Sequence, residues 1–286
     1  MAGYPYQAPM GLRCVVFYNR KGNLKIQNSK LTLEKTEKYS YVADTFHCDF
    51  NHELCFGHLG NAMLNAADVH STRRNFGMTY LNTIHKTWVL SRLAIELNET
   101  PTEHAPLTIE TWVENAMKYF TKRNWAITSE DGGKVYGYGK SIWAMIDTET
   151  RNPQDILAIH DGKIRDYLFP EKECPIADVS RVMFPHDAEG IQEETFTVKY
   201  SDIDVNGHLN SMKYVEHVLD TFPMDHYRQY HLQRLEIAYV AEGHHGDTIV
   251  IQHIAENDLH HSYRLIRRDA DGETELCRVK LIFTLK

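Results

Sequence analysis

The sequence predicts an α+β protein built from two similar halves, each an antiparallel sheet wrapped around one helix. Three observations predict this architecture. Short sequence segments of the first half recur in the second half in the same order. A helical segment opens each half, and long strands rich in aromatic and β-branched residues follow it. We expect the two sheets to join edge to edge.

The internal repeat is clearest in the later strands of each half. Asp131-Gly132 matches Asp271-Gly272 at an offset of 140 residues, and "TIETWVENA" meets "TIVIQHIAEN" at the same offset. With short gaps, "RLAIEL" meets "RLEIAY" at an offset of 142, and the first "GHL" meets the second at an offset of 150. The preserved order indicates two units with one plan.

The first half is predicted to span residues 36–150 and to begin with a helix over "HLGNAMLNAADVHST". Its apolar and small residues recur at three- and four-residue steps, which places Leu59, Met63, Ala66, Ala67 and His70 on one buried face. Four strands follow, and "EDGG" marks a hairpin between the last two. Their sequences are "KTWVLSRLAIEL", "PLTIETWVENA", "YFTKRNWAITS" and "KVYGYGKSIWAMID".

Residues 151–194 are predicted to be a linker, because four prolines break the periodicity there. One short helix is expected near residues 155–167. The second half, residues 195–286, repeats the plan with a leading strand "ETFTVKYSDID", a helix "NSMKYVEHVLD" and four strands. Its helix should bury Met212, Val215, Val218 and Leu219. Residues 1–35 have no counterpart in the second half and are assigned no role.

Composition indicates an ordinary globular protein of 286 residues, with 42% hydrophobic and 24% charged residues. No apolar run approaches the about 18 residues of a membrane span, and the N-terminus lacks the pattern of a secretory signal. Five cysteines without a CxxC pair favour a reducing compartment, so we expect a cytoplasmic protein.

The net charge of −8, without a long basic block, argues against a nucleic-acid binder. An acidic partner could still dock on a local basic patch, although such clusters usually form a solvated face. The candidates are Arg73 and Arg74; Lys118, Lys122 and Arg123; and Arg264, Arg267 and Arg268.

The segment "DIDVNGHLNSMKY", residues 202–214, is the candidate site. In an extended approach to the helix, alternate residues project to one side, so Asp204, Asn206 and His208 should converge at the helix N-terminus. Backbone N–H groups there can stabilise a developing oxyanion. The alternative is that Asn206 and Asn210 merely cap the helix. Capping needs only one such residue, so the constellation favours a functional site.

The first half serves as an internal control for this segment. At the offset of 150, His58 aligns with His208, but Leu54 aligns with Asp204 and Phe56 replaces the asparagine. The first half is therefore expected to keep the architecture without the acids and to be non-catalytic.

The segment resembles the signature D-x-D-V-N-x-H-x-N-x-x-K-Y of the acyl-acyl carrier protein (acyl-ACP) thioesterases, and every fixed position is present. The similarity extends over about residues 41–286. It implies a tandem hotdog fold and hydrolysis of fatty acyl thioesters. The plant members of the family have an active carboxylate followed by cysteine where this chain has Glu242 and Gly243. Glycine cannot act as a nucleophile, so the resemblance implies that water attacks the thioester.

In the implied mechanism, His208 and a carboxylate of Asp204 or Glu242 orient and deprotonate this water, while Asn206 and helix N–H groups hold the thioester carbonyl. The two carboxylates remain alternatives for this role. The slot expected between the first helix and its sheet would hold the acyl chain. Its predicted lining is Met63, Ala66, Ala67, Trp88 and Trp112, with Leu90 and Met145 as further candidates.

The implied partner is the acyl carrier protein, whose phosphopantetheine arm carries the acyl chain, so the protein needs no cofactor of its own. No metal is expected, because no HExxH or CxxC motif frames the pairs His244-His245 and His260-His261. The interpretation leaves room for a homodimer. Two alternatives remain: an acyl-CoA thioesterase, and a non-catalytic protein that binds acyl thioesters.

Overall fold

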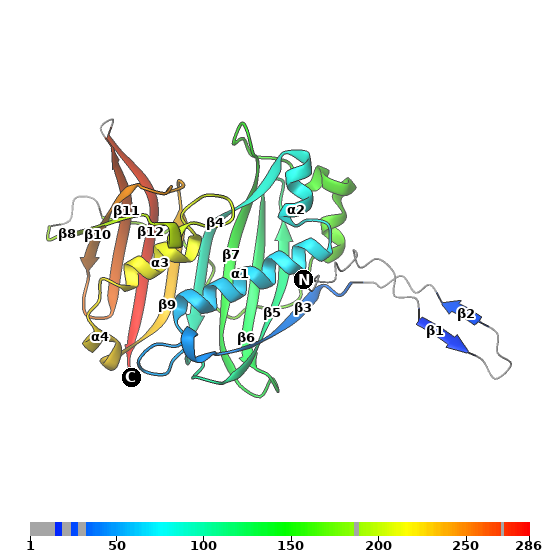
Figure 1. The fold of residues 1–286 in the computed structure, drawn as a ribbon, viewed down its shortest axis with the longest axis horizontal. Coiled ribbons are helices and arrows are strands. Elements are labelled where there is room, and N and C mark those ends of the chain that lie inside the picture. The colour runs from blue at the N-terminus through cyan, green and yellow to red at the C-terminus, as the bar shows by residue number, and fades with distance from the viewer. Residues whose placement is uncertain (1–14, 19–23, 28–32, 186–188, 270–271) are drawn as a thin grey trace, which may run out of the picture. The chain divides into compact units, whose positions relative to one another are not determined.

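One ten-stranded antiparallel sheet, with its main helices on one face, organises the chain from residue 35 onward (Figure 1). The computed structural model describes residues 15–18, 24–27, 33–185, 189–269 and 272–286. The strands follow one another in space as β3 (Thr36–Val42), β5 (Pro106–Ala116), β6 (Phe120–Ser129), β7 (Val135–Asp147), β4 (Lys86–Leu97), β9 (Tyr230–Tyr239), β12 (Gly272–Leu285), β11 (His260–Asp269), β10 (Thr248–Ala255) and β8 (Gln192–Thr197).

The two halves join where β4 pairs with β9. Arg92 lies opposite Ala238 and Ile95 opposite Leu235 in an antiparallel ladder. The side chains of Ile95 and Leu235 are fully buried in a core that is continuous across the junction. The α+β class and the edge-to-edge joining of two sheets predicted from the repeat are therefore confirmed.

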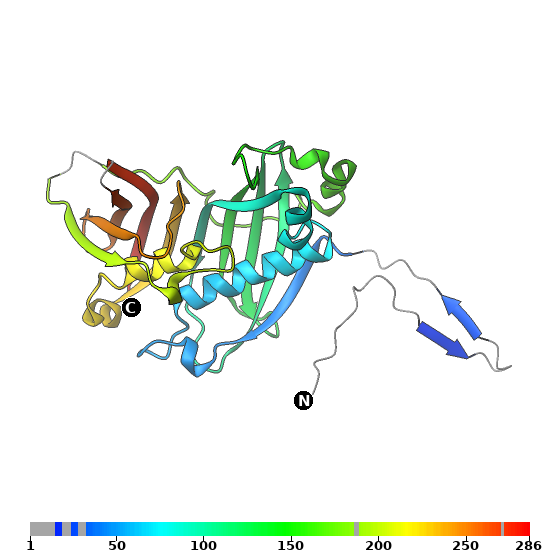
Figure 2. The ribbon, with the colours of Figure 1, turned by 45° about the horizontal axis from the view of Figure 1, so that its top comes forward.

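Two helices cover the same face of this sheet (Figures 1 and 2). The long helix α1 (Phe56–Arg73) buries all five residues of its predicted stripe. The shorter helix α3 (Ser211–Leu219) buries Met212, Val215 and Val218, while Leu219 is only partly buried. Each stripe removes apolar surface from water, which is the main stabilising term for an amphipathic helix.

The two helices approach each other closely where α1 carries two glycines. A Cβ atom on Gly57 would lie 2.7 Å from Cγ of Glu216, and one on Gly60 would contact Met212. A larger residue at Gly60 would push the helices apart, whereas one at Gly57 would displace the partly exposed Glu216 side chain. The glycines of "FGHLG" thus allow the close packing of α1 on α3.

The remaining helices are short and lie in the connections. They are η1 (Thr45–His47), α2 (Met78–Leu81), η2 (Asn82–Ile84), η3 (Ile156–Tyr167), η4 (Tyr200–Asp202) and α4 (Met224–Gln229). The helix expected near residues 155–167 is η3, which consists of 3-10 turns interrupted by left-handed residues. His160, Asp161 and Gly162 have φ values of 49°, 55° and 79° there.

The part of the predicted linker that follows η3 contacts side chains on the face of the sheet opposite α1. Asp178 forms an ion pair with Lys140 of β7 at 3.0 Å, and Arg278 of β12 donates to the carbonyl of Val182 at 3.4 Å. The linker therefore contacts strands from both halves.

In the unit formed by residues 1–34, β1 (Val15–Tyr18) pairs antiparallel with β2 (Leu24–Gln27). Most of the rest of the predicted extension lies outside the described residues.

Candidate functional site

The segment "DIDVNGHL" forms a tight turn. Ile203 pairs with Leu209, and the N–H of Asp204 donates to the carbonyl of His208 at 2.9 Å. Gly207 takes φ +82°, a conformation that favours glycine. The expected extended approach is therefore wrong: β8 already ends at Thr197, and the 3-10 turn η4 intervenes.

Asp204 organises this turn through its carboxylate. Oδ1 accepts the N–H of Asn206 at 2.8 Å and that of His208 at 3.2 Å, and Oδ2 lies 3.5 Å from the Asn206 amide nitrogen. Asn210, and not Asn206, caps α3 by accepting the N–H of Met212 at 2.8 Å. The capping explanation thus accounts for Asn210 only, and the Asn206 side chain is available for another role.

His208 and Glu242 face each other beside the turn. Oε2 of Glu242 lies 3.5 Å from Nε2 of His208, and its Oε1 accepts from Arg151 at 2.5 Å. The N–H of Gly243 donates to the Tyr214 hydroxyl at 2.9 Å, and burial raises the pKa of that hydroxyl. Both interactions fix the loop that carries Glu242.

A cavity of about 580 Å³ begins at the turn and follows α1. Asp204 and Asn206 lie at one end, and Trp88 and Tyr167 line it farther along the first half. His208 and Glu242 are not among its lining residues, but the N–H of His208 donates to Oδ1 of Asp204 and its carbonyl accepts the N–H of Asp204. The second half therefore supplies the turn, and the first half supplies most of the cavity wall.

The structure places two of the five predicted acyl-contact residues, Ala67 and Trp88, on this wall. Met63 and Ala66 are fully buried in the core and do not line the cavity. Trp112 lies on the opposite face of the sheet, where Nζ of Lys172 sits 4.8 Å from its ring. Alternation along β5 explains this placement, because Val113, its neighbour, points into the cavity.

A buried polar cluster lies along the cavity and was not expected from the sequence. Arg123 donates to Thr111 Oγ1 at 3.1 Å and to Ser71 Oγ at 2.9 Å, and its Nη2 lies 3.5 Å from His70 Nδ1. Burial lowers the pKa of Arg123 to about 9 and that of His70 to about 2. His70 fitted the apolar stripe of α1, so only the partners on β5 and β6 reveal its polar surroundings.

Most of the basic clusters considered from the sequence are bound to carboxylates. Lys122 pairs with Asp178, Arg264 with Glu275, and Arg73 and Arg74 share Glu37; Arg267 pairs with Asp247 and Asp269, and Arg268 with Glu193 and Glu273. These local partners reduce the positive potential that each cluster offers to an acidic partner.

Within the described residues, no three His, Cys, Asp or Glu side chains are placed to hold a metal ion. No helix in the same part of the chain is long and apolar enough to cross a bilayer.

The first half contains a turn of the same geometry. Cys48 pairs with Leu54, and Oδ1 of Asp49 accepts the N–H of Asn51 at 2.8 Å and that of Glu53 at 3.1 Å. The N–H of Asp49 donates to the carbonyl of Glu53 at 2.8 Å, as in the turn of the candidate site. By these contacts, residues 48–54 are equivalent to residues 203–209, at an offset of 155 residues.

The alignment through the two "GHL" sequences is therefore wrong at this point. In the first half "GHL" lies inside α1, whereas in the second half it closes the turn before α3. Leu54 and Phe56 thus do not replace Asp204 and Asn206. The first half keeps the aspartate and the asparagine, and Glu53 stands where the second half has histidine.

Comparisons with known proteins follow the same two halves. Residues 34–159 match the family model for the acyl-ACP thioesterase N-terminal domain, and residues 186–285 match that for the C-terminal domain. The chain is 26% identical over 157 residues to a chloroplastic palmitoyl-acyl carrier protein thioesterase of Gossypium hirsutum, covering 54% of this chain and 38% of that protein. It is 27% identical over 185 residues to an oleoyl-acyl carrier protein thioesterase of Arabidopsis thaliana, covering 60% of this chain and 49% of that protein. Each match thus spans less than half of the relative's length.

Solved structures match nearly from end to end. An acyl-ACP thioesterase from Bacteroides thetaiotaomicron is 42% identical, with a TM-score of 0.79 over 87% of this chain and 98% of that one. The 12:0-ACP thioesterase from Umbellularia californica shares the fold at 18% identity, with a TM-score of 0.77 over 89% of this chain and 99% of that one. These likenesses confirm the predicted tandem hotdog fold.

Proposed function

The chain belongs to the acyl-ACP thioesterase family, and we propose that it hydrolyses fatty acyl-ACP thioesters to free fatty acid and holo-ACP. One observation carries the proposal most directly. A cavity of about 580 Å³ ends at Asp204 and Asn206, and the His208–Glu242 pair adjoins the same turn. A thioester carbonyl at the turn and an acyl chain in the cavity would fit this arrangement.

We assign the chemistry to these residues as follows. His208 takes a proton from a water molecule whose oxygen adds to the thioester carbonyl carbon. Glu242, held by Arg151, orients the imidazole ring and stabilises its protonated form. The Asn206 amide donates to the carbonyl oxygen as negative charge develops on it. The carbon–sulfur bond then breaks, and the pantetheine sulfur leaves as a thiol with the proton from His208.

Asp204 has a positioning role in this proposal. Its carboxylate accepts both backbone N–H bonds of the turn and lies beside the Asn206 amide, so it sets where that amide points. We therefore assign different roles to Glu242 and Asp204, which remained alternatives on the sequence alone: one carboxylate supports the base, and the other supports the carbonyl-binding group.

The proposed partner is the acyl carrier protein, and its phosphopantetheine arm enters with the substrate. The mechanism uses side chains and water and assigns no cofactor or metal to the protein. The fatty acyl chain would pass along α1 beside Leu64 and Ala67 toward Trp88.

Thiol release from a panel of acyl-ACPs, with the matching acyl-CoAs alongside, tests the function. We expect turnover that favours the carrier protein, is abolished by His208→Ala and is nearly unchanged by His58→Ala, because His58 lines a different cavity. Preference for the CoA thioesters would make the protein an acyl-CoA thioesterase. Acyl binding without turnover by folded protein would instead support a non-catalytic binder.

A further inference from the structure

A second large cavity, of about 600 Å³, lies at the turn of the first half. Asp49 and Asn51 line it, together with residues of α3 and α4 from the second half. The arrangement of the candidate site is thus reversed: here the first half supplies the turn, and the second half supplies much of the wall.

The walls of the two cavities correspond near their turns. The offset of 155 that superposes the turns also superposes the first residues of α3 on those of α1. It pairs Leu219 with Leu64 and Asp220 with Asn65, and all four residues line their respective cavities. On the sheet, the offset of 142 pairs Tyr230 with Trp88, which also line the two cavities. The second cavity is therefore the repeat-related copy of the first.

We propose that this second cavity is a binding site for an uncharged fatty acyl thioester, which it holds without hydrolysing it. The inference rests on the proposed function, because it takes the ligand of the second cavity from that of the first. Three further observations specify what the site can do and what it can hold.

The second cavity lacks the histidine and the carboxylate that are assigned to hydrolysis beside the first. Glu53 occupies the place of His208 in the turn. On the adjoining loop, Leu54 donates to the carbonyl of Pro101 at 2.8 Å, as its counterpart in the second half does to Gly243, so Thr100 stands in the place of Glu242. An imidazole–carboxylate pair does stand at this turn, His52 with Glu103 at 2.7 Å, but neither residue takes the place of His208 or Glu242 and neither lines the cavity. The aspartate and asparagine that shape the turn remain.

The charges of the lining favour an uncharged ligand. Four carboxylates line this cavity, those of Asp49, Glu53, Glu216 and Asp220. Two lysines line it as well, and both are paired: Lys213 with Glu216 at 2.5 Å and Lys286 with Glu53 at 2.8 Å. A free fatty carboxylate would add a like charge here, whereas a thioester carries none at its carbonyl.

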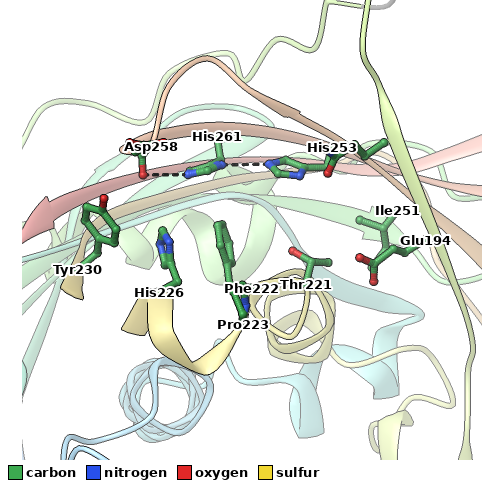
Figure 3. Close-up of a pocket in the computed structure, with 11 residues that line it drawn as sticks. Glu194, Thr221, Phe222, Pro223, His226, Tyr230, Ile251, His253, Asp258 and His261 are labelled. Atoms are coloured by element: carbon green, nitrogen blue, oxygen red, sulfur yellow. Dashed lines mark hydrogen bonds between the residues drawn. The ribbon is translucent and has the colours of Figure 1, made fainter. Parts of the chain in front are cut away.

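Phe222 limits the depth of the second cavity. It matches Ala67 in sequence at the offset of 155, although it follows the end of α3 whereas Ala67 lies inside α1. Phe222 lines both this cavity and a separate one of about 360 Å³. Figure 3 shows the Phe222 ring pointing toward the His261–His253 pair inside that separate cavity. In the first half the small Ala67 leaves one continuous cavity. The second site should therefore prefer shorter acyl chains than the first.

The test counts binding sites with a stable analogue, S-(2-oxodecyl)pantetheine, in which a methylene separates the carbonyl from the sulfur. Calorimetric titration of the full chain should give two sites. Leu219→Trp should remove one site and leave acyl-ACP hydrolysis within about twofold of the unaltered rate. The matched variant Leu64→Trp should remove the other site and abolish hydrolysis. Both leucines are partly buried against the same core, so both changes perturb folding similarly.

Met224→Trp provides a second variant, because Met224 lines the same cavity and its side chain is 52% exposed. A single site that is lost in Leu64→Trp and kept in Leu219→Trp and Met224→Trp would overturn the inference and leave the proposed hydrolysis standing. Equal binding of decanoate at the second site would overturn the assignment of an uncharged ligand. Two sites without acyl-ACP hydrolysis would contradict the proposed function instead.

Discussion

The carboxylate of Glu242 faces the imidazole of His208, with 3.5 Å between Oε2 and Nε2. Its other oxygen is bound to Arg151, which follows β7 in the first half. The first residue of the predicted linker thus holds the carboxylate that we propose supports the base in the second half. Because Glu242 contacts both His208 and Arg151, its effect on the imidazole can be tested apart from its effects on net charge and packing.

Glu242→Gln should lower kcat on acyl-ACP about 100-fold, because a neutral amide cannot stabilise the imidazolium formed during proton transfer. KM should change little, since Glu242 does not line the cavity. Full activity in the variant would remove Glu242 from the mechanism.

Asp204→Asn should lower kcat by about 100-fold or more while the protein stays folded, because the amide changes how the turn holds Asn206. The repeat supplies a matched control in Asp49→Asn, which alters the same hydrogen bonds in the other turn. Steady-state thiol release and circular dichroism on both variants make the comparison. Equal losses of activity would mean that Asp204 acts only through folding.

Ala67→Phe should shorten the acyl chains that the enzyme prefers, because it places in the first cavity the side chain that divides the second. Each methylene that can no longer be buried costs about 0.8 kcal/mol, roughly a fourfold loss in kcat/KM. Ala67→Ser serves as the control of similar size. An unaltered profile across acyl-ACPs of increasing length would show that the acyl chain does not pass Ala67.

Gly60→Ala should destabilise the fold by about 1–3 kcal/mol, because the added methyl overlaps the fully buried Met212. Gly57→Ala should be close to neutral, since Glu216 is partly exposed and can rotate away. Urea unfolding of both variants measures the difference. Similar stabilities would mean that α1 and α3 can separate at little cost.

Stability should fall on mild acidification through the buried histidines of the second half. Burial and the neighbouring His261 lower the pKa of His253 from 6.5 to about 4. As the pH falls, the unfolded chain therefore binds a proton at His253 before the folded chain does. The contribution of neutral His253 to the free energy of unfolding is complete above pH about 6.5 and is lost as the pH falls toward 4.

Nε2 of His253 lies 3.0 Å from Nδ1 of His261, and protonation of both rings would bring two N–H groups together. Denaturant unfolding at pH 7 and pH 5 should show a smaller loss of stability for His253→Gln than for the unaltered protein. An equal loss in both would assign the acid sensitivity to other groups.

Most strands of the sheet and the two main helices could be predicted because their signals are local, although β3 was not predicted. The range of β4 is that of "KTWVLSRLAIEL", and the stripe of α1 holds the predicted residues. The turn could not be predicted, because one "GHL" lies in a helix and the other in a turn. The same three-residue sequence therefore adopts two different structures. Only the hydrogen bonds of Asp49 and Asp204 show which residues of the two halves are equivalent.

The sequence predicted the candidate site except for Arg151, because a motif and the family resemblance supplied the other four residues. Asp204, Asn206 and His208 stand within five residues of one another, so a motif reveals them. Arg151 reaches Glu242 from 91 residues away, and nothing in the sequence around either residue indicates the pair. Trp112 was misplaced because its strand is buried on both faces, which removes the alternation that would have assigned its direction.

The β4–β9 ladder also determines what either half would do alone. Each of these strands would become a bare edge, with the N–H and C=O groups that point across the ladder left without partners. A separately expressed half would tend to pair its exposed edge strand with the same strand of a second copy of itself. For the first half, such a self-made pair would carry two Asp49 turns and no His208, so it would be a symmetric assembly without a catalytic base.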